Sequence, residues 1–375
     1  MSIKMDDSWE KVNKIVIFGY GRQARRILNK LDKDFDIVAV VDNSEKVIGT
    51  EWKKGKYVRK TEDILEQFHD VKIIVCLMGK NYESVSKQLE IMGFDEGKDY
   101  IKCEEFITDW YLRYRNELCI MSMDVLTTTY CNLKCQGCAA FVPYIKNARH
   151  ITCNEIVRSL DSFFRVCDYC FSMMLYGGEP LLNPNLPHIL DEITRRYSPK
   201  IGYLGIITNG CCKLNGNVLE SIIRNKVSIS ISDYSDMSGY EEKVEDFCSV
   251  LKSNNIDFNR NINMEWRNLG FPKEQIKLFP IEGQTHKESC GQVCHAVVNG
   301  KIYYCATAAV AEESKLFPRC KKDFYELDEL INMPGAKYIL QEFICGIDTD
   351  YKGFCDVCGG FGMDNPNIIK AGRQN

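Results

Sequence analysis

The sequence lacks the features of a membrane or secreted protein. Its longest apolar run covers residues 73–79, which is the length of a buried strand and far below the ~18 residues that a membrane-spanning helix needs. Residues 1–14 are charged and contain no apolar stretch of the kind found in signal peptides. We therefore expect a cytoplasmic protein with no membrane span.

An excess of basic residues is also missing. Lysine and arginine number 48 against 52 aspartates and glutamates, so the net charge is −4. A protein that binds nucleic acid usually carries a basic surplus or stripe, and we therefore expect no nucleic-acid partner. The 5 histidines do not have the spacing of metal ligands, which disfavours a histidine-rich metal site.

Cysteine, in contrast, is abundant, with 19 among 375 residues. Disulfides rarely persist in a reducing cytoplasm, so closely spaced cysteines predict ligation of a metal ion or an iron–sulfur cluster. The other proportions, 45% hydrophobic and 27% charged, are those of an ordinary globular protein. The length predicts two or three domains.

The hydrophobic pattern predicts an α/β protein in three parts. Residues 1–116 alternate strands with helices, which is typical of a Rossmann-like parallel sheet. Residues 117–284 repeat β/α units and suit a partial (β/α)6 barrel, whose chemistry lies at the carboxyl ends of its strands. Residues 285–375 are rich in cysteine and poor in helical periodicity, which predicts a small cysteine-rich module.

The apolar period of each segment predicts its secondary structure. Thr152 and Glu155 have the spacing of a capping box at the start of a helix. In the first part we expect strands at 14–18, 36–41 and 71–78, helices at 25–31, 62–68 and 82–92, and a linker helix at 109–118. In the second part we expect strands at 120–126, 171–176, 203–208, 227–232 and 257–262, with amphipathic helices between them.

Three cysteines stand close together after the first strand of the second part, as Cys131-x3-Cys135-x2-Cys138. Thiolates bind soft metals and iron–sulfur clusters. Three ligands in one loop leave one iron of a four-iron cluster without a protein ligand, so that a substrate or cofactor can bind there. Buried or zinc-binding cysteines are the alternative.

This motif resembles the signature of the radical S-adenosylmethionine (radical SAM) superfamily. The resemblance implies that Cys131, Cys135 and Cys138 bind a catalytic [4Fe-4S] cluster and that S-adenosylmethionine chelates its fourth iron. It also implies reductive cleavage of S-adenosylmethionine to a 5′-deoxyadenosyl radical, which abstracts hydrogen from a substrate. A reducing partner such as flavodoxin or ferredoxin would supply the electron.

Three further features stand where the resemblance requires cofactor-binding residues. Each follows or forms a predicted strand: Gly177-Gly178-Glu179-Pro180, Thr208-Asn209, and the alternating Ser228, Ser230 and Ser232. The resemblance assigns the cofactor's amino group to the first motif and its ribose and carboxylate to the serine strand. The period of 2 puts the three serines on one face of the strand.

The chain departs from the resemblance at Gly137. The family usually has an aromatic residue immediately before the third cysteine, close to the adenine of the cofactor. Phe141 is the nearby aromatic residue that could replace it.

The spacing Cys290-x9-Gly300-x4-Cys305 with Cys355 and Cys358 resembles the auxiliary-cluster modules of radical SAM enzymes, known as SPASM and twitch. The resemblance implies a second [4Fe-4S] cluster on these four cysteines. Alternative ligands are Cys294, Cys320 and Cys345, and a small zinc site is the other interpretation.

The first part carries Gly19-x-Gly21-x-x-Ala24 after a strand and Asp42 at the end of the next. This order fits a dinucleotide fingerprint, in which glycines and a helix N-terminus approach phosphate and the acidic residue binds ribose. The stretch also resembles small domains of nucleotide-sugar and surface-polysaccharide enzymes, which implies a bound nucleotide or nucleotide-sugar. A tight turn capped by Asp42 is the alternative.

These observations predict a radical SAM enzyme, of oxidoreductase or epimerase type, that acts on a nucleotide-linked sugar or a surface-polysaccharide precursor. A radical SAM enzyme that modifies a peptide is the alternative. A non-catalytic iron–sulfur or electron-transfer protein is the third interpretation, and the Gly178-Glu179-Pro180 motif argues against it.

Overall fold

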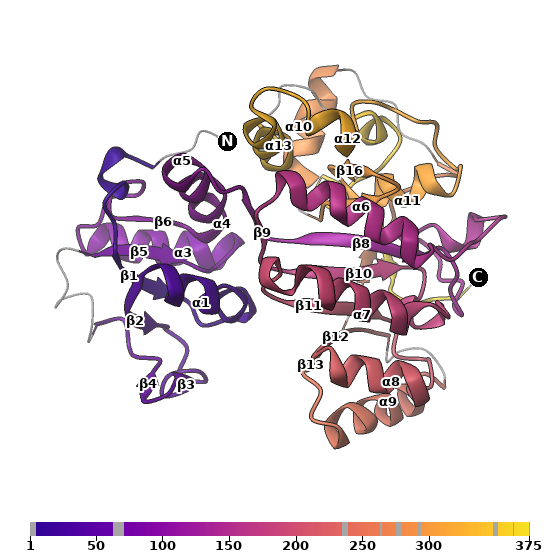
Figure 1. Ribbon diagram of the computed structural model, residues 1–375, viewed down its shortest axis with the longest axis horizontal. Coiled ribbons are helices and arrows are strands. Elements are labelled where there is room, and N and C mark those ends of the chain that lie inside the picture. The colour runs from indigo at the N-terminus through magenta and orange to yellow at the C-terminus, as the bar shows by residue number, and fades with distance from the viewer. Residues whose placement is uncertain are drawn as a thin grey trace. The chain divides into compact units, whose positions relative to one another are not determined.

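The computed structural model divides into two compact units, Met1–Met121 with Asp168–Phe171, and Ser122–Cys167 with Ser172–Asn375 (Figure 1). It describes residues 5–62, 71–234, 239–262, 265–274, 280–290, 294–347, 352–362 and 364–374. Most of the helix expected at 62–68 lies outside these residues.

The first unit contains a parallel sheet in the order β2-β1-β5-β6. The strands expected at 14–18 and 36–41 are confirmed, the third is shorter than expected, and β6 was not predicted. The bounds are β1 (Lys14–Phe18), β2 (Asp36–Val41), β5 (Lys72–Val75) and β6 (Tyr100–Lys102), with helices α1 (Arg22–Asp34) and α3 (Gly79–Ile91) and a hairpin of β3 (Glu51–Lys53) and β4 (Lys56–Tyr57).

Strand β1 is buried on both faces, as expected for the centre of a parallel sheet. Ile15 and Ile17 pack into one apolar cluster, whereas Val16 and Phe18 pack into another. A continuous helical segment follows β6 and replaces the linker helix expected at 109–118. It consists of α4 (Cys103–Glu105), a π-helical turn (Phe106–Trp110) and α5 (Tyr111–Arg115), and it ends at Asn116 in the left-handed conformation.

The second unit is built on an eight-stranded sheet in the order β13-β12-β11-β10-β8-β15-β16-β17. Helices α6 to α9 connect its parallel strands and cover one face (Figure 1). The strands are β8 (Met123–Thr128), β10 (Met173–Gly177), β11 (Leu204–Thr208), β12 (Ser228–Asp233), β13 (Phe258–Ile262), β15 (Ala296–Val298), β16 (Lys301–Tyr303) and β17 (Phe324–Glu326). The helices are α6 (Cys153–Val166), α7 (Leu186–Tyr197), α8 (Gly216–Arg224) and α9 (Glu241–Ser253).

The five strands expected in the second part are confirmed with small shifts of their bounds, and α8 is an addition. The capping box of α6 is also confirmed, because the Thr152 side chain accepts from the Glu155 N–H and Glu155 accepts from the Thr152 N–H. The first predicted strand is divided, since Cys119–Ile120 forms the separate strand β7, which pairs with β9 (Tyr169–Cys170) in the first unit.

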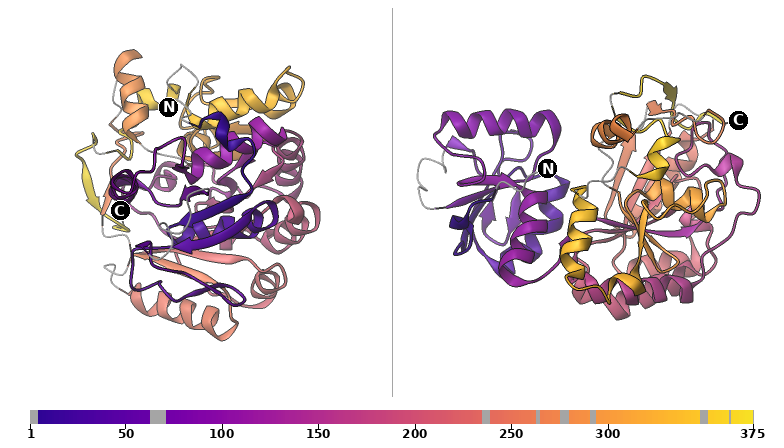
Figure 2. Two further views of the ribbon diagram at one scale, coloured as in Figure 1. Left: turned by 90° about the vertical axis from the view of Figure 1, so that its left-hand side faces the viewer. Right: turned by 90° about the horizontal axis from the view of Figure 1, so that it is seen from above.

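The cysteine-rich part contributes to the same sheet instead of forming a separate body, as Figure 2 shows from two further sides. Strand β15 runs parallel to β8 and then turns back into β16 and β17. A second short ribbon pairs β14 (Glu265–Arg267) with β18 (Ile368–Lys370) in antiparallel register. The remaining helices are α10 (Pro280–Cys290), α11 (Ala306–Glu313), α12 (Leu327–Leu330) and α13 (Ala336–Cys345).

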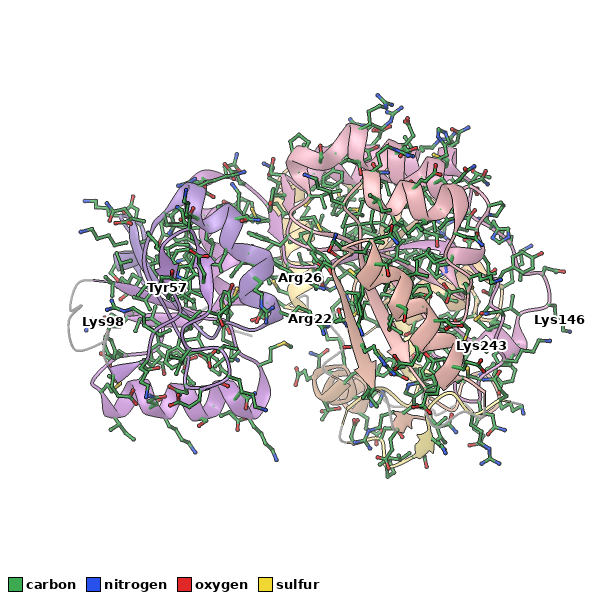
Figure 3. The ribbon with its side chains drawn as sticks, turned by 90° about the horizontal axis from the view of Figure 1, so that it is seen from below. Arg22, Arg26, Tyr57, Lys98, Lys146 and Lys243 are labelled. Carbon is green, nitrogen blue, oxygen red and sulfur yellow. The ribbon has the colours of Figure 1, made fainter. Side chains whose placement is uncertain are left out.

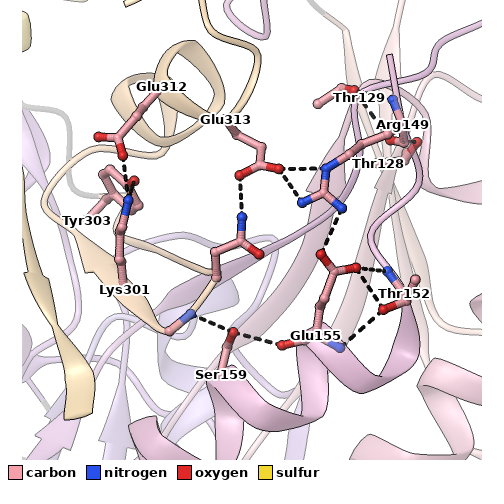
Figure 4. A network of polar contacts seen from close by, with 12 residues as sticks. Thr128, Thr129, Arg149, Thr152, Glu155, Ser159, Lys301, Tyr303, Glu312 and Glu313 are labelled. Carbon is pink, nitrogen blue, oxygen red and sulfur yellow. Dashed lines mark hydrogen bonds and ion pairs between the residues drawn. The ribbon is translucent and has the colours of Figure 1, made fainter. Parts of the chain in front are cut away.

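Arg149 ties this sheet to its flanking helices (Figure 4). Its guanidinium donates to Glu155 at the start of α6 (2.8 Å) and to Glu313 at the end of α11 (2.7 Å). Its backbone N–H donates to the Thr129 hydroxyl just beyond β8 (2.9 Å). The network therefore holds the carboxyl end of β8 where the cysteine loop begins. Among the described residues, no helix is long and apolar enough to cross a membrane.

Candidate functional site

A cavity of about 480 Å³ lies at the carboxyl ends of the parallel strands in the second unit. This is the edge at which α/β folds place their binding sites. Among the predicted site residues, it is lined by Cys131, Cys135, Cys138, Gly177, Gly178, Thr208, Asn209 and Ser232. Segments from four different strands therefore bring eight of these residues to one cavity.

The cysteine loop begins directly after β8, and its three thiols line this cavity. Cys131 Sγ accepts from the Leu133 N–H (3.4 Å) and lies 3.7 Å from Asn209 Nδ2. Burial raises the pKa of the Cys131 thiol to about 12, and it raises the pKa of Cys135 and Cys138 as well. A bound metal would replace these protons, because the thiolate is the form that ligates.

The described residues contain no group of three or more His, Cys, Asp or Glu side chains placed to share one metal ion. A four-iron cluster makes a different demand, since each iron takes a thiolate of its own. The donor set of the loop, three thiols and no carboxylate, has the softness that such a cluster requires.

Gly177 and Gly178 are required by the approach of two backbone segments. A Cβ on Gly177 would lie 2.0 Å from the Thr128 carbonyl oxygen, and one on Gly178 would lie 2.1 Å from that of Tyr130. The Gly178 N–H donates to Thr128 O (2.9 Å) and the Glu179 N–H donates to Tyr130 O (2.7 Å). The two glycines thus fasten the end of β10 to the chain that enters the cysteine loop, while their own backbone also lines the cavity.

Glu179 is fully buried and lies behind the cavity wall, not among the residues that line it. One carboxylate oxygen accepts from the Leu181 N–H (3.1 Å) and the other from the Asn209 N–H (2.8 Å). Burial raises the pKa of Glu179 to about 7, against these two hydrogen bonds, which lower it. Pro180 is buried at the start of the 3-10 turn Pro180–Leu182 that this carboxylate caps.

Asn209 connects several parts of the site. Its side-chain amide donates to Asn132 in the cysteine loop (2.8 Å), and its carbonyl oxygen accepts from the Tyr240 hydroxyl (2.6 Å). The neighbouring Thr208 hydroxyl accepts from the Gly210 N–H (3.1 Å). The carboxyl end of β11 is therefore fixed between β10 and the cysteine loop.

The three serines of β12 do not share one environment. Ser232 lines the cavity, whereas Ser228 and Ser230 are buried and are not among its lining residues. Ser230 accepts hydrogen bonds from Asn259 (3.2 Å) and Asn261 (3.1 Å) of β13. Ile229 and Ile231, on the opposite face of the strand, are fully buried.

Phe141 does not replace the aromatic residue missing at position 137. It is buried against Phe271 and Phe354 in an apolar cluster and does not line the cavity. Two other aromatic residues, Tyr234 and Trp266, line the cavity and contact each other edge-on with ring centroids 5.3 Å apart.

Sequence reasoning missed further residues of the cavity wall. Asp124 and Tyr176 also line it, and the Tyr176 hydroxyl donates to Ala306 O (3.0 Å). Asp124 carried a usable signal, because a carboxylate within an apolar strand is unusual. Tyr176 also carried one, because it ends the predicted strand directly before Gly177.

A second, smaller cavity brings together the four cysteines expected to form the auxiliary site. Cys290, Cys305, Cys355 and Cys358 all line it. The alternatives lie elsewhere: Cys294 lines the larger cavity, Cys320 packs against Gly353, and Cys345 ends helix α13.

The backbone around the smaller cavity points N–H groups at its thiols. Cys290 accepts from the Phe361 N–H (3.4 Å) and Cys358 from the Gly360 N–H (3.4 Å). Cys305 is the N-cap of α11, so the backbone N–H groups of the first helical turn lower the pKa of its thiol. Burial raises the pKa of Cys305 to about 11, although these bonds and the helix N-terminus favour its thiolate.

In the first unit, local structure accounts for Gly19 and Asp42. Gly19 has φ +94°, and a Cβ there would lie 2.9 Å from the Leu77 side chain. The two carboxylate oxygens of Asp42 accept from the Tyr20 N–H (2.7 Å) and the Ser44 N–H (2.8 Å). This arrangement favours the alternative of a capped turn.

Packing does not account for Gly21 as it does for Gly19, because no atom lies within 4 Å of the position that a Cβ on Gly21 would take. It is the N-cap of α1, on which Arg22 and Arg26 stand one turn apart (Figure 3).

Comparison with known proteins identifies the central part of the chain. Residues 125–264 match the family model of the Radical SAM superfamily. This central segment is therefore similar to radical SAM domains. Residues 11–99 match the family described as C2185-like, N-terminal. No curated protein matches the chain.

Several solved structures are similar to this chain. The anSMEcpe structure with bound AdoMet and Cp18Cys peptide is 22% identical with a TM-score of 0.31 and covers 38% of this chain and 44% of its own. BtrN in complex with AdoMet and 2-DOIA is 16% identical (TM-score 0.40; 63% and 93% covered). SuiB of Streptococcus suis bound to S-adenosylmethionine is 13% identical (TM-score 0.31; 75% and 83% covered). The match spans less than half of the length of anSMEcpe.

The burial of Glu179 predicts a pH dependence of stability. Its pKa is about 7 when folded, against 4.5 for an unperturbed glutamate, so the folded state binds the extra proton. The stability that depends on this group is present below about pH 4.5 and is lost as the pH rises through 7. Relative to Glu179→Gln, the wild-type protein should lose about 3 kcal/mol between pH 4 and pH 8 in urea unfolding of the metal-free chain.

The matched control is Glu155→Gln. The pKa of Glu155 is lowered by its bonds to Thr152 and Arg149, so its contribution to stability is lost as the pH falls. The two variants should therefore differ from wild type with opposite slopes. Equal slopes for wild type and Glu179→Gln would show that the Glu179 carboxyl is not buried as described.

Asp42→Ala tests the turn in the first unit. Removing the acceptor of two backbone N–H groups should lower the free energy of unfolding by about 1–2 kcal/mol. Asp42→Asn keeps one acceptor and should lose less. Urea unfolding of the full chain measures both, and calorimetric titration with nucleotides and nucleotide-sugars runs in parallel. Unchanged stability with lost nucleotide binding would contradict the capping role.

Proposed function

We propose that this protein is a radical SAM enzyme in which Cys131, Cys135 and Cys138 hold a [4Fe-4S] cluster. The observation that carries the proposal is the convergence of three thiols, two glycine backbones and the polar residues Thr208, Asn209 and Ser232 on one cavity. When bound, the cluster and S-adenosylmethionine supply a 5′-deoxyadenosyl radical that abstracts hydrogen from the substrate.

The chain's own residues have distinct parts in this proposal. The three thiolates bind iron, and the N–H groups directed at Cys131 offset the thiolate charge. The backbone of Gly177 and Gly178 offers close approach to the cofactor. Glu179 acts indirectly, because its carboxylate fixes the Asn209 backbone and does not line the cavity.

The second cavity is proposed to hold an auxiliary [4Fe-4S] cluster on Cys290, Cys305, Cys355 and Cys358. Four thiols, two of which accept from backbone N–H groups, have the donor chemistry of such a cluster. A structural zinc ion is the alternative, because zinc also accepts four thiolates.

For the substrate we propose a nucleotide-linked sugar or a related polysaccharide precursor, with a flavodoxin or ferredoxin as reductant in the cytoplasm. The cavity wall includes Arg267, which is able to face an anionic group. Gly21, at the start of α1 with open space beside it, is the proposed nucleotide contact of the first unit. Gly19 and Asp42 shape the turn that leads to it. A peptide substrate is the alternative.

The first experiment tests the loop. Anaerobically reconstituted protein with a strong reductant should cleave S-adenosylmethionine to 5′-deoxyadenosine. Replacing Cys131, Cys135 and Cys138 by alanine should reduce cleavage to background, measured by chromatography. The control replaces the buried Cys76, Cys153 and Cys248, which line neither cavity, and should keep cleavage. Undiminished cleavage without the loop cysteines would refute the assignment.

The second experiment tests the auxiliary site by metal analysis. After strictly anaerobic preparation, the variant without the loop cysteines should retain about four irons with the broad absorption of a cluster. Removing Cys355 and Cys358 as well should release them, because both thiols line the smaller cavity. Zinc in place of iron would identify a structural zinc site.

A further inference from the structure

The C-terminal segment, residues 366–374, runs beside the cysteine loop. Its strand β18 pairs with β14, and the chain then continues past Gly372 to the loop. The Gln136 N–H donates to Arg373 O (2.7 Å), and Cys135 and Gln374 form an isolated antiparallel bridge. The segment is thus hydrogen-bonded to the middle of the loop.

The loop and the segment are shaped for each other. A Cβ on Gly137 would lie 2.0 Å from Ile369 Cδ1, so a side chain at position 137 would have to displace the end of Ile369. Gly137 also has φ +63°, a conformation that favours glycine. The absence of an aromatic residue before Cys138 therefore has a cause within this chain: Ile369 occupies the space.

The side chain of Gln374 uses both ends of its amide. Its Oε1 accepts from the Lys134 N–H (2.7 Å). Its Nε2 donates to Cys135 Sγ (3.1 Å) and to Gly372 O (2.7 Å). One residue, 239 positions away in the sequence, therefore both anchors the loop and places a hydrogen-bond donor on a thiol of the proposed cluster site.

We infer that Gln374 is a positioning residue that orients Cys135 and sets the reduction potential of the cluster held by the loop. The inference rests on the proposed function. A hydrogen bond to a ligating sulfur stabilises the more negative, reduced state of a cluster and so raises its potential. The effect is strong at Cys135, because its sulfur is buried and water does not compete for it.

Three variants of the full chain separate anchoring, hydrogen bonding and charge. Gln374→Ala removes the anchor and the donor. Gln374→Glu keeps an acceptor for the Lys134 N–H but removes the donor and adds a negative charge. Arg373→Ala is the charge control, because it changes the net charge by the same amount at the adjacent residue. The Arg373 side chain is exposed, and only its backbone carbonyl contacts the loop.

The potential of the loop cluster is measured by redox titration with electron paramagnetic resonance, with the auxiliary cysteines replaced so that one cluster is observed. We expect a lower potential in Gln374→Ala than in wild type, and a lower potential in Gln374→Glu than in Arg373→Ala. Chelators should remove iron about tenfold faster from Gln374→Ala. In protein that keeps the auxiliary cysteines, loss of the loop irons alone from Gln374→Ala supports the same role. Potentials equal within each pair would overturn the inference.

Hydrogen exchange of the metal-free protein distinguishes this inference from the proposed function. Amide exchange at Lys134 and Gln136 should be faster in Gln374→Ala and close to wild type at Lys134 in Gln374→Glu, because only alanine removes the acceptor. If wild-type protein binds no cluster at the loop, the proposed function fails. If exchange is unchanged in Gln374→Ala, the anchoring by Gln374 fails even where the cluster forms.

Discussion

The candidate site depends on the backbone contact between the end of β10 and the chain that leaves β8. Two hydrogen bonds join these segments, from the Gly178 N–H to Thr128 O and from the Glu179 N–H to Tyr130 O. They form only because Gly177 and Gly178 have no Cβ. Any side chain there would move the strands apart at the place where the cysteine loop begins. The glycine pair therefore determines where the loop cysteines lie, in addition to any contact with a cofactor.

Buried polar groups extend this contact across the sheet. Glu179 joins the end of β10 to Asn209, and Asn209 reaches the cysteine loop through Asn132. Burial removes water from Glu179 and destabilises its charged form, which is why the pKa of Glu179 is raised. Both carboxylate oxygens of Glu179 accept a hydrogen bond from a backbone N–H group. The carboxylate therefore holds these two backbone segments firmly in place, because any displacement would leave a buried polar group without a partner.

Much of the fold follows from local patterns, whereas the site depends partly on pairing that no local pattern reveals. The apolar period was sufficient for β1, β2, β8 and the four strands β10 to β13, and the spacing of Thr152 and Glu155 was sufficient for the capping box. Strand β15 was missed because three residues carry too little periodicity, although parallel pairing with β8 buries them completely.

The same limit applies within the site. The alternation of β12 puts its serines and isoleucines on opposite faces. The environment of Ser230 depends on the neighbouring strand β13, because Asn259 and Asn261 donate hydrogen bonds to its hydroxyl. Asp42 has the position expected of a ribose ligand, yet its oxygens accept from two backbone N–H groups nearby. Sequence spacing places a residue near a site, and the competing hydrogen bonds then determine its role.

The two cysteine cavities are separated by very little protein. Cys305 lines the smaller cavity, while the next two residues, Ala306 and Thr307, line the larger one. Phe361 lines both, and its N–H donates to Cys290. If both cavities hold clusters as proposed, the first turn of α11 and one aromatic ring are the material between them. A displacement of this turn or of Phe361 would then change the lining of both cavities at once.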